Sequence, residues 1–141
     1  MIVILLREIM SRQLVTVTPD TPLSEARHLL AEHRIRRLPV IAGRRLVGIV
    51  SDRDVRSASA SHDRTPVAQI MTRNVVTATS QMRVDEAARI MLDGRFGGLP
   101  VVDGGGELTG IVTETDLLRA LIDVLETESS ERIAVDFGGA A

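Results

Sequence analysis

The sequence predicts an α+β protein, with helices and strands mixed along the chain, in which two pseudo-symmetric β-α-β-β-α repeats pack as one module. Three observations lead to this prediction. An ordered set of short motifs occurs twice within the 141 residues. Apolar residues inside each copy alternate between helical and strand periodicity. The composition, 44% hydrophobic and 26% charged, is typical of globular domains and leaves room for one sizeable core.

The repeat has an offset of 61 residues in its first part and 62 in its second, and the extra residue falls in a glycine-rich turn. A surface hairpin tolerates an insertion of that kind. So many matches in one order indicate a duplicated unit. The matched motifs are Ile9-Met10 and Ile70-Met71, Val15-Thr16 and Val76-Thr77, Glu25-Ala26 and Glu86-Ala87, Leu38-Pro39-Val40 and Leu99-Pro100-Val101, and Gly48-Ile49-Val50 and Gly110-Ile111-Val112.

In the first copy, a short strand containing Thr16 precedes a helix that Thr21 caps and Pro22 opens. Two β-branched runs, 38–41 and 46–50, follow as a hairpin, and a second helix begins at Ser51. The apolar face of the first helix consists of Leu23, Ala26, Leu29, Leu30 and His33.

The second copy repeats these elements. Its first helix stops at Gly94, its strands are 99–102 and 108–112, and its last helix begins at Thr113. The apolar stripe of its first helix consists of Val84, Ala87, Ala88 and Met91, and its last helix runs through Leu117, Leu118, Leu121, Ile122 and Leu125.

The chain therefore divides into a first repeat with the start of the linker (1–64), a second repeat (65–128) and a C-terminal tail (129–141). The crossing between the copies is the Ser/Ala-rich segment 57–61, and Thr65-Pro66 caps a short helix that leads into Met71. In the tail, 132–137 alternates like a strand, which suits an edge strand or a partner contact.

Composition excludes several kinds of chemistry. All seventeen basic residues are Arg and there is no Cys, so Schiff-base enzymes, thiol nucleophiles, disulfides and cysteine-ligated zinc are absent. The three His residues do not form a metal-ligand pattern, and no metal is expected. The apolar start, 1–6, is too short for a secretory signal or a membrane span, so we expect a cytoplasmic protein that does not insert in membranes.

Charge is distributed unevenly. Residues 1–64 hold eleven Arg and seven acids, and residues 65–141 hold six Arg and twelve acids. This asymmetry attracts the halves to each other or draws an anionic ligand to the first half. Nucleic acid is not an expected partner, because the net charge is -2 and two Phe without Trp or Tyr leave almost no surface for base stacking.

Taken together, Ile-Met, Leu-Pro-Val and Gly-Ile-Val-Ser/Thr-x-x-Asp, each occurring twice from residue 7 to about residue 126, resemble a tandem cystathionine-β-synthase (CBS) domain pair, the Bateman module. The resemblance implies a regulatory module without catalytic residues or a required cofactor. It implies clefts between the repeats for AMP, ADP, ATP or S-adenosylmethionine, and a homodimer that acts on an unidentified regulated protein.

The Ser/Thr-x-x-Asp motif suits a nucleoside phosphate. A hydroxyl at a helix start, Ser51 or Thr113, lies where backbone N–H groups favour a phosphate. The carboxylate one turn later, Asp54 or Asp116, accepts hydrogen bonds from ribose hydroxyls. The alternative interpretation is a capping box, in which the same side chains satisfy the helix terminus. The two interpretations are compatible.

The resemblance also assigns residues to two clefts. We favour the first for a phosphorylated ligand, because Arg36 and Arg37 supply fork-shaped donors there, whereas Gly97 and Gly98 supply only backbone and space to the second. The alternative for the arginines is a solvated strand end that pairs with the acidic half. The first cleft takes Thr16, Arg36, Arg37, Leu38, Thr113 and Asp116, and the second takes Ser51, Asp54, Thr77, Gly97, Gly98 and Leu99.

A competing function is a dimeric interaction or scaffold module with vestigial clefts, whose interface is built from residues 1–6 and 117–125. An enzyme is not expected, because the chain has no length left for a catalytic barrel of about 250 residues.

Overall fold

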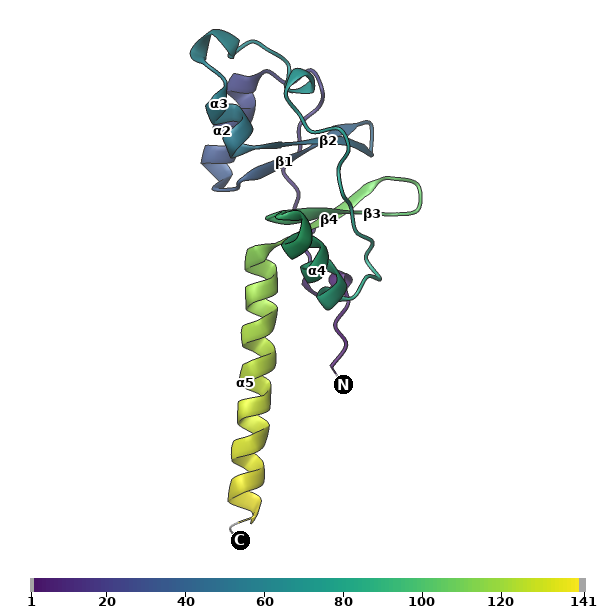
Figure 1. Cartoon of the computed structure of the whole chain (residues 1–141), viewed down its shortest axis with the longest axis vertical. Coiled ribbons are helices and arrows are strands. Elements are labelled where there is room, and N and C mark those ends of the chain that lie inside the picture. The colour runs from purple at the N-terminus through teal and green to yellow at the C-terminus, as the bar shows by residue number, and fades with distance from the viewer. Residues whose placement is uncertain (1, 140–141) are drawn as a thin grey trace.

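The computed structural model describes residues 2–139, with side chains described for residues 2–128 (Figure 1). It confirms the α+β prediction. The helices are α1 (Leu6–Ile9), α2 (Leu23–His33), α3 (Asp52–Ser57), α4 (Val84–Gly94) and α5 (Glu114–Gly139), with 3₁₀ turns η1 (Ala60–His62) and η2 (Val67–Gln69). The strands are β1 (Arg37–Ala42), β2 (Arg45–Ser51), β3 (Gly98–Val102) and β4 (Leu108–Thr113).

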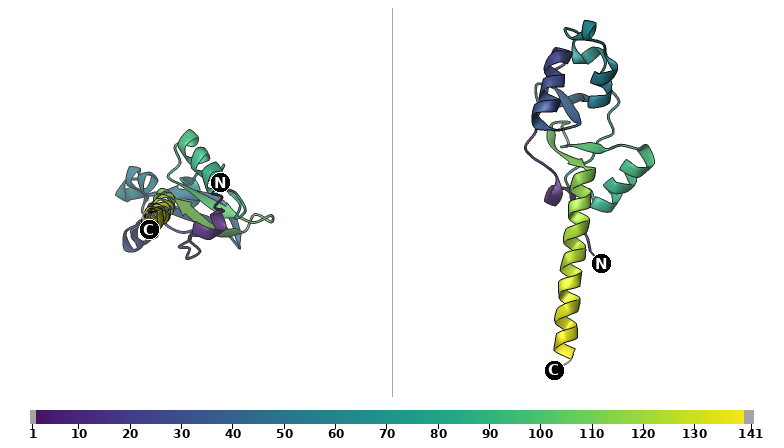
Figure 2. Two further views of the ribbon diagram at one scale, coloured as in Figure 1. Left: turned by 90° about the horizontal axis from the view of Figure 1, so that it is seen from below. Right: turned by 90° about the vertical axis from the view of Figure 1, so that its left-hand side faces the viewer.

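Each repeat contributes one antiparallel hairpin, β1–β2 or β3–β4. Helices α2 and α3 pack beside the first hairpin and α4 beside the second, so that the halves lie one above the other in Figure 1. Helix α5 projects from the second half beyond the rest of the molecule, as Figure 1 and the right-hand view of Figure 2 show.

The strand predicted at the start of each repeat is reduced to one parallel bridge. Val17 bridges to Val40 in β1, and Ala78 bridges to Val101 in β3. The Val17 N–H donates to Pro39 O at 3.1 Å, and the Ile41 N–H donates to Val17 O at 2.8 Å. The chain therefore runs beside β1 or β3 at the predicted place, but it makes too few hydrogen bonds with that strand to form a strand itself.

The other edge of each hairpin, formed by β2 or β4, pairs with a segment from the opposite repeat. Ser11 forms an antiparallel bridge with Ile111 in β4, and Thr72 forms one with Ile49 in β2. The Ser11 N–H donates to Ile111 O at 2.9 Å, and the Ile111 N–H donates back to Ser11 O at 3.0 Å. The segments that begin the two repeats are thus exchanged between the halves.

Glycine makes this exchange possible. A Cβ at Gly48 would lie 2.5 Å from Met71 Sδ, and a Cβ at Gly110 would lie 2.9 Å from Met10 Sδ. Both methionines are buried, Met71 in the core of the first half and Met10 in that of the second. The repeated Ile-Met and Gly-Ile-Val motifs are therefore two sides of one packing contact, and the methionines fill the core.

The two cores do not follow the order of the sequence. Leu6 and Met10 pack with Ala87, Leu99 and Val112 in the second half. The cores are joined again at the hairpin tips, where the Leu46 N–H donates to Gly106 O at 3.1 Å. The predicted divisions of the chain at residues 64 and 128 stay predictions.

Helix ends depart from the sequence predictions in part. Pro22, not Thr21, is the N-cap of α2, and the Thr21 hydroxyl instead accepts a hydrogen bond from the Thr18 N–H. Helix α4 ends at Gly94 as predicted, but the left-handed residue that follows is Arg95, with φ 57°. His33, placed on the buried face of its helix, is exposed, because it lies in the last position of α2.

The edge-strand alternative for 132–137 is wrong, since these residues continue α5. The alternative of a partner contact stays a prediction. No Gly or Pro interrupts the sequence between Glu114 and Phe137, and extending a helix that has already formed adds a hydrogen bond for each residue fixed. A strand there would need a partner.

Alanine at Gly48 or Gly110 is expected to lower the free energy of unfolding by about 1–3 kcal/mol, because the added methyl group overlaps a buried methionine. Urea denaturation measures the loss. Gly104→Ala is the matched control, since a Cβ there meets nothing within 4 Å. Equal transition midpoints for all three variants would contradict the packing described.

Candidate ligand-binding site

Two clefts lie between the repeats, each made from both. The first cleft has a volume of about 440 Å³ and combines the start of α5 with the segment 11–15 and the approach to β1. The second cleft, of about 660 Å³, combines the start of α3 with the segment 72–76 and the approach to β3. Both volumes fall within the usual range for small-molecule sites.

Equivalent positions of the two repeats line the two clefts. The exchanged segments bring Gln13 and Val15 to the first cleft and Asn74 and Val76 to the second. An apolar wall faces them, formed by Pro39 and Ile111 in the first cleft and by Pro100 and Ile49 in the second.

The two helix-start motifs line the clefts, one motif in each. Ser51 and Asp54 form a capping box at α3, in which the Asp54 N–H donates to Ser51 Oγ at 3.1 Å and the Ser51 N–H donates to Asp54 Oδ2 at 2.9 Å. At α5, the N–H and the hydroxyl of Thr113 both donate to Asp116 Oδ2, at 2.8 and 3.1 Å. The capping interpretation therefore holds at Ser51. In both motifs, one carboxylate oxygen of the Asp, Oδ2 of Asp54 or Asp116, accepts a hydrogen bond at the start of its own helix.

The structure brings together eight of the twelve predicted cleft residues. Arg36, Arg37, Thr113 and Asp116 line the first cleft, and Ser51, Asp54, Gly97 and Gly98 line the second. The remaining four do not line either cleft. Leu38 and Leu99 are buried in the two cores, and Thr16 and Thr77 are half-buried beside the lining residues Val15 and Val76.

Sequence reasoning missed the arginines that follow the helices. Arg34 and Arg95 occupy equivalent positions in the repeats, both with left-handed backbone, at φ 53° and 57°. Arg34 lines the first cleft and Arg95 lines the second. The signal available in the sequence was that Arg occurs at the same position of both repeats, 61 residues apart. The structure adds the left-handed backbone, which a non-glycine residue seldom adopts without a local reason.

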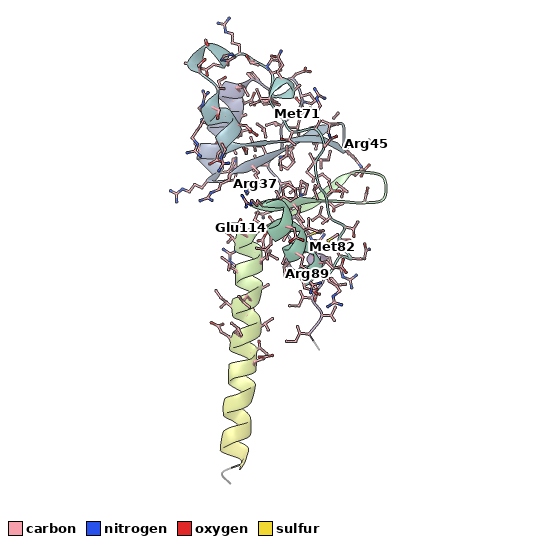
Figure 3. The ribbon with its side chains drawn as sticks, in the orientation of Figure 1. Arg37, Arg45, Met71, Met82, Arg89 and Glu114 are labelled. Carbon is pink, nitrogen blue, oxygen red and sulfur yellow. The ribbon has the colours of Figure 1, made fainter. Side chains whose placement is uncertain are left out.

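The structure corrects the reason for favouring the first cleft. Arg36 and Arg37 line both clefts, so they do not distinguish one from the other. Figure 3 shows Arg37 between the two hairpins, close to the start of α5. The second cleft also carries three arginines that the first lacks, namely Arg53, Arg56 and Arg95.

One carboxyl group has a clearly shifted pKa, and it lies outside both clefts. The pKa of Asp85, at the start of α4, is lowered chiefly by hydrogen bonds from Arg83, at 2.9 and 3.0 Å. Within residues 2–128, no group of three or more His, Asp or Glu side chains is arranged to hold a metal ion. No helix in the described part of the chain has the length and apolar character of a membrane span.

This fold, a pair of exchanged repeats with a cleft on each side, defines a tandem repeat module. The chain belongs to the CBS domain family, whose model matches residues 6–61 and 67–123, one match for each repeat. A CBS domain-containing protein of Dictyostelium discoideum is 41% identical over 137 residues, which cover 87% of this chain and 94% of the relative.

Other relatives share only this region. Inosine-5'-monophosphate dehydrogenase of Korarchaeum cryptofilum is 43% identical over 106 residues, and that of Thermoplasma acidophilum is 37% identical over 110 residues. These matches cover 75% and 78% of this chain but 22% of each dehydrogenase. The chain thus spans about a fifth of the length of these enzymes.

Solved structures of CBS domain pairs have the same fold. The pair of protein MJ0100, solved with 5'-methylthioadenosine and S-adenosyl-L-methionine, has a TM-score of 0.78 at 33% identity. CBSX2 of Arabidopsis thaliana, solved with AMP, has a TM-score of 0.78 at 30% identity. Each comparison covers 85% of this chain and 97% of the other.

Ser51→Ala is expected to lower the free energy of unfolding by about 1 kcal/mol, because it removes the acceptor of the Asp54 N–H at the start of α3. Ser57→Ala, at the other end of the helix, is the control and should change stability by less than about 0.5 kcal/mol. Urea denaturation compares the two variants, and equal losses would argue against the capping role.

Proposed function

We propose that this protein is a non-catalytic regulatory module that binds an adenosine-containing ligand (AMP, ADP, ATP or S-adenosylmethionine) and reports it to a regulated protein. One observation carries the proposal. Each of the two clefts combines a helix-start hydroxyl and carboxylate with a segment exchanged from the other repeat, in a chain whose structural relatives were solved with AMP or with S-adenosylmethionine.

The cleft residues divide into three chemical parts that match the three parts of a nucleotide. The apolar wall, Pro39 with Ile111 or Pro100 with Ile49, suits the adenine ring. We assign the Oδ1 atoms of Asp54 and Asp116 to the ribose hydroxyls, since their Oδ2 atoms serve the helix termini. The arginines supply paired N–H donors for phosphate.

Absence of catalysis is part of the proposal. The related dehydrogenases match this chain only over its paired CBS domains, about a fifth of their length. The clefts hold no Cys or Lys nucleophile, because the sequence contains neither residue. In the two Ser/Thr-x-x-Asp motifs, the hydroxyls of Ser51 and Thr113 are hydrogen-bonded within their own helix starts.

A retained nucleotide should be visible in the ultraviolet spectrum of the purified protein, because a chain without Trp or Tyr is nearly transparent where purines absorb. We expect a purine band that separates with the small molecules after denaturation and that mass spectrometry identifies. A flat spectrum, followed by no heat on titration with AMP, ATP or S-adenosylmethionine, would contradict the proposal.

Asp54→Ala and Asp116→Ala should each weaken calorimetric binding of the adenosyl ligand in their own cleft by tenfold or more, because each removes a charged acceptor for ribose. Asp85→Ala is the matched control, since it removes a carboxylate from a helix start outside both clefts. Thermal unfolding verifies that the variants are folded. Full binding by both cleft variants would rule out this assignment.

A second candidate function is a dimeric interaction module, and one surface favours it. An apolar groove of about 630 Å³ runs between α4 and α5. Leu92 and Leu118 in it are 78% and 60% exposed, and Ile122 and Leu125 stand exposed farther along α5. The equivalent surface of the first repeat is polar, with an Arg27–Asp63 ion pair at 2.8 Å.

We propose a second copy of this chain as the occupant of that groove. The chain supplies both the groove and, in the projecting part of α5, an apolar helix face to fill it (Figure 2). Two copies related by a two-fold axis would each bury this face, as a self-complementary interface requires.

Leu121→Glu should convert the dimer to a monomer, because it introduces a charge into the groove. Sedimentation equilibrium measures the mass. Ser59→Glu, at the equivalent position of the first repeat, should leave the dimer intact. A wild-type monomer at high concentration would exclude this interface.

A further inference from the structure

The duplication provides two equivalent pairs of positions next to the clefts, but only one pair is charged. Arg36 and Arg37 precede Leu-Pro-Val in the first repeat, and Gly97 and Gly98 occupy the same positions in the second. Both clefts are therefore served by one pair of arginines rather than by two.

Arg37 lies over the glycines of the other repeat. A Cβ built on Gly97 would collide with Nη2 and Cζ of Arg37, and one built on Gly98 would lie 3.7 Å from Arg37 Cδ. Gly97 and Arg37 both line both clefts. The missing side chain at residue 97 thus makes the space that the guanidinium occupies, at the wall between the two clefts.

The charges around this shared wall differ between the clefts. In the first cleft, Arg34 and the shared pair face Glu114 and Asp116. The second cleft adds Arg53, Arg56 and Arg95 to the shared pair, against Asp52 and Asp54. Arg56 is partly neutralised by Asp52, at 3.5 Å. The second cleft remains the more basic of the two, and it is also the larger.

We propose that Arg37 is a specificity-determining residue common to both clefts, through which a nucleoside polyphosphate binds to one cleft at a time, with the second cleft preferred. This inference rests on the proposed function. A guanidinium pairs bidentately with one phosphate group. A polyphosphate in the second cleft therefore takes the Arg37 donors and adds negative charge at the wall of the first. An uncharged nucleoside has no phosphate group to pair with Arg37 and adds no negative charge at this wall.

Calorimetric titration with ATP and with adenosine tests this coupling. The wild-type protein should bind two adenosines per chain with similar affinity, but one ATP per chain, with any second ATP at least about tenfold weaker. Asp54→Ala should weaken the first ATP event, and Asp116→Ala should leave it unchanged.

Arg37→Gln isolates the shared residue. It should weaken the first ATP event by about tenfold or more, bring the two ATP affinities within about threefold of each other, and change adenosine binding by less than about twofold. Arg45→Gln is the control, because Arg45 is an exposed arginine at a hairpin tip, outside both clefts.

The outcomes separate this inference from the proposed function. Two equal ATP sites, a single adenosine site, or an unchanged ATP profile in Arg37→Gln would overturn the coupling and leave adenosyl-ligand binding in place. Failure of the wild-type protein to bind ATP, adenosine, AMP or S-adenosylmethionine would overturn both.

Discussion

The contact between a methionine of one repeat and a glycine of the other is the constraint on which the module depends. Met10 packs over Gly110, and Met71 packs over Gly48. Each contact holds the next residues in place as an added edge of the opposite hairpin, where Ser11 pairs with Ile111 and Thr72 pairs with Ile49. The same segments then continue along the walls of the clefts. Core packing, sheet edge and cleft lining thus follow from one exchange.

Duplication kept the backbone of the two halves alike while their surface chemistry diverged. The hairpins have the same register, with an irregularity after Val40 in one and after Val101 in the other. The residues that face solvent or the clefts differ instead: arginines stand opposite glycines at the shared wall, and a polar surface in the first repeat corresponds to an apolar groove in the second. Symmetry in the fold therefore coexists with asymmetry in the surface chemistry of the two halves.

Most of the fold could be predicted from the sequence, because the motif order is repeated and the apolar periodicity is clear. The hairpins, the first helix of each repeat and the helix-start motifs all lie where expected. The local sequence pattern is less informative where tertiary pairing sets the register. Thr16 and Thr77 were assigned to the clefts, but the bridges formed by Val17 and Ala78 fix a register in which Val15 and Val76 line the cavities instead. A one-residue difference of this kind is set by partners that are distant in sequence.

The sharing of Arg36 and Arg37 was likewise beyond sequence reasoning, because it depends on where a long side chain crosses from one repeat to the other. Repeat equivalence shows that these positions differ from Gly97 and Gly98, but not that the guanidinium lies over the glycine backbone. The left-handed Arg34 and Arg95 were a clearer signal, since the same residue type recurs at the same repeat position.

Exchange of the opening segments also bears on how such a chain arose. In a single unit on its own, the strand that contains Gly48 or Gly110 would have no segment paired with its outer edge. The unit would gain that pairing only from the opening segment of a second molecule, as in a domain-swapped dimer. Fusing two units along one chain turns that encounter between molecules into a contact within one molecule, at the high effective concentration that a short linker provides. Once joined in this way, the two units no longer had to be identical, and each copy became free to change its own side chains.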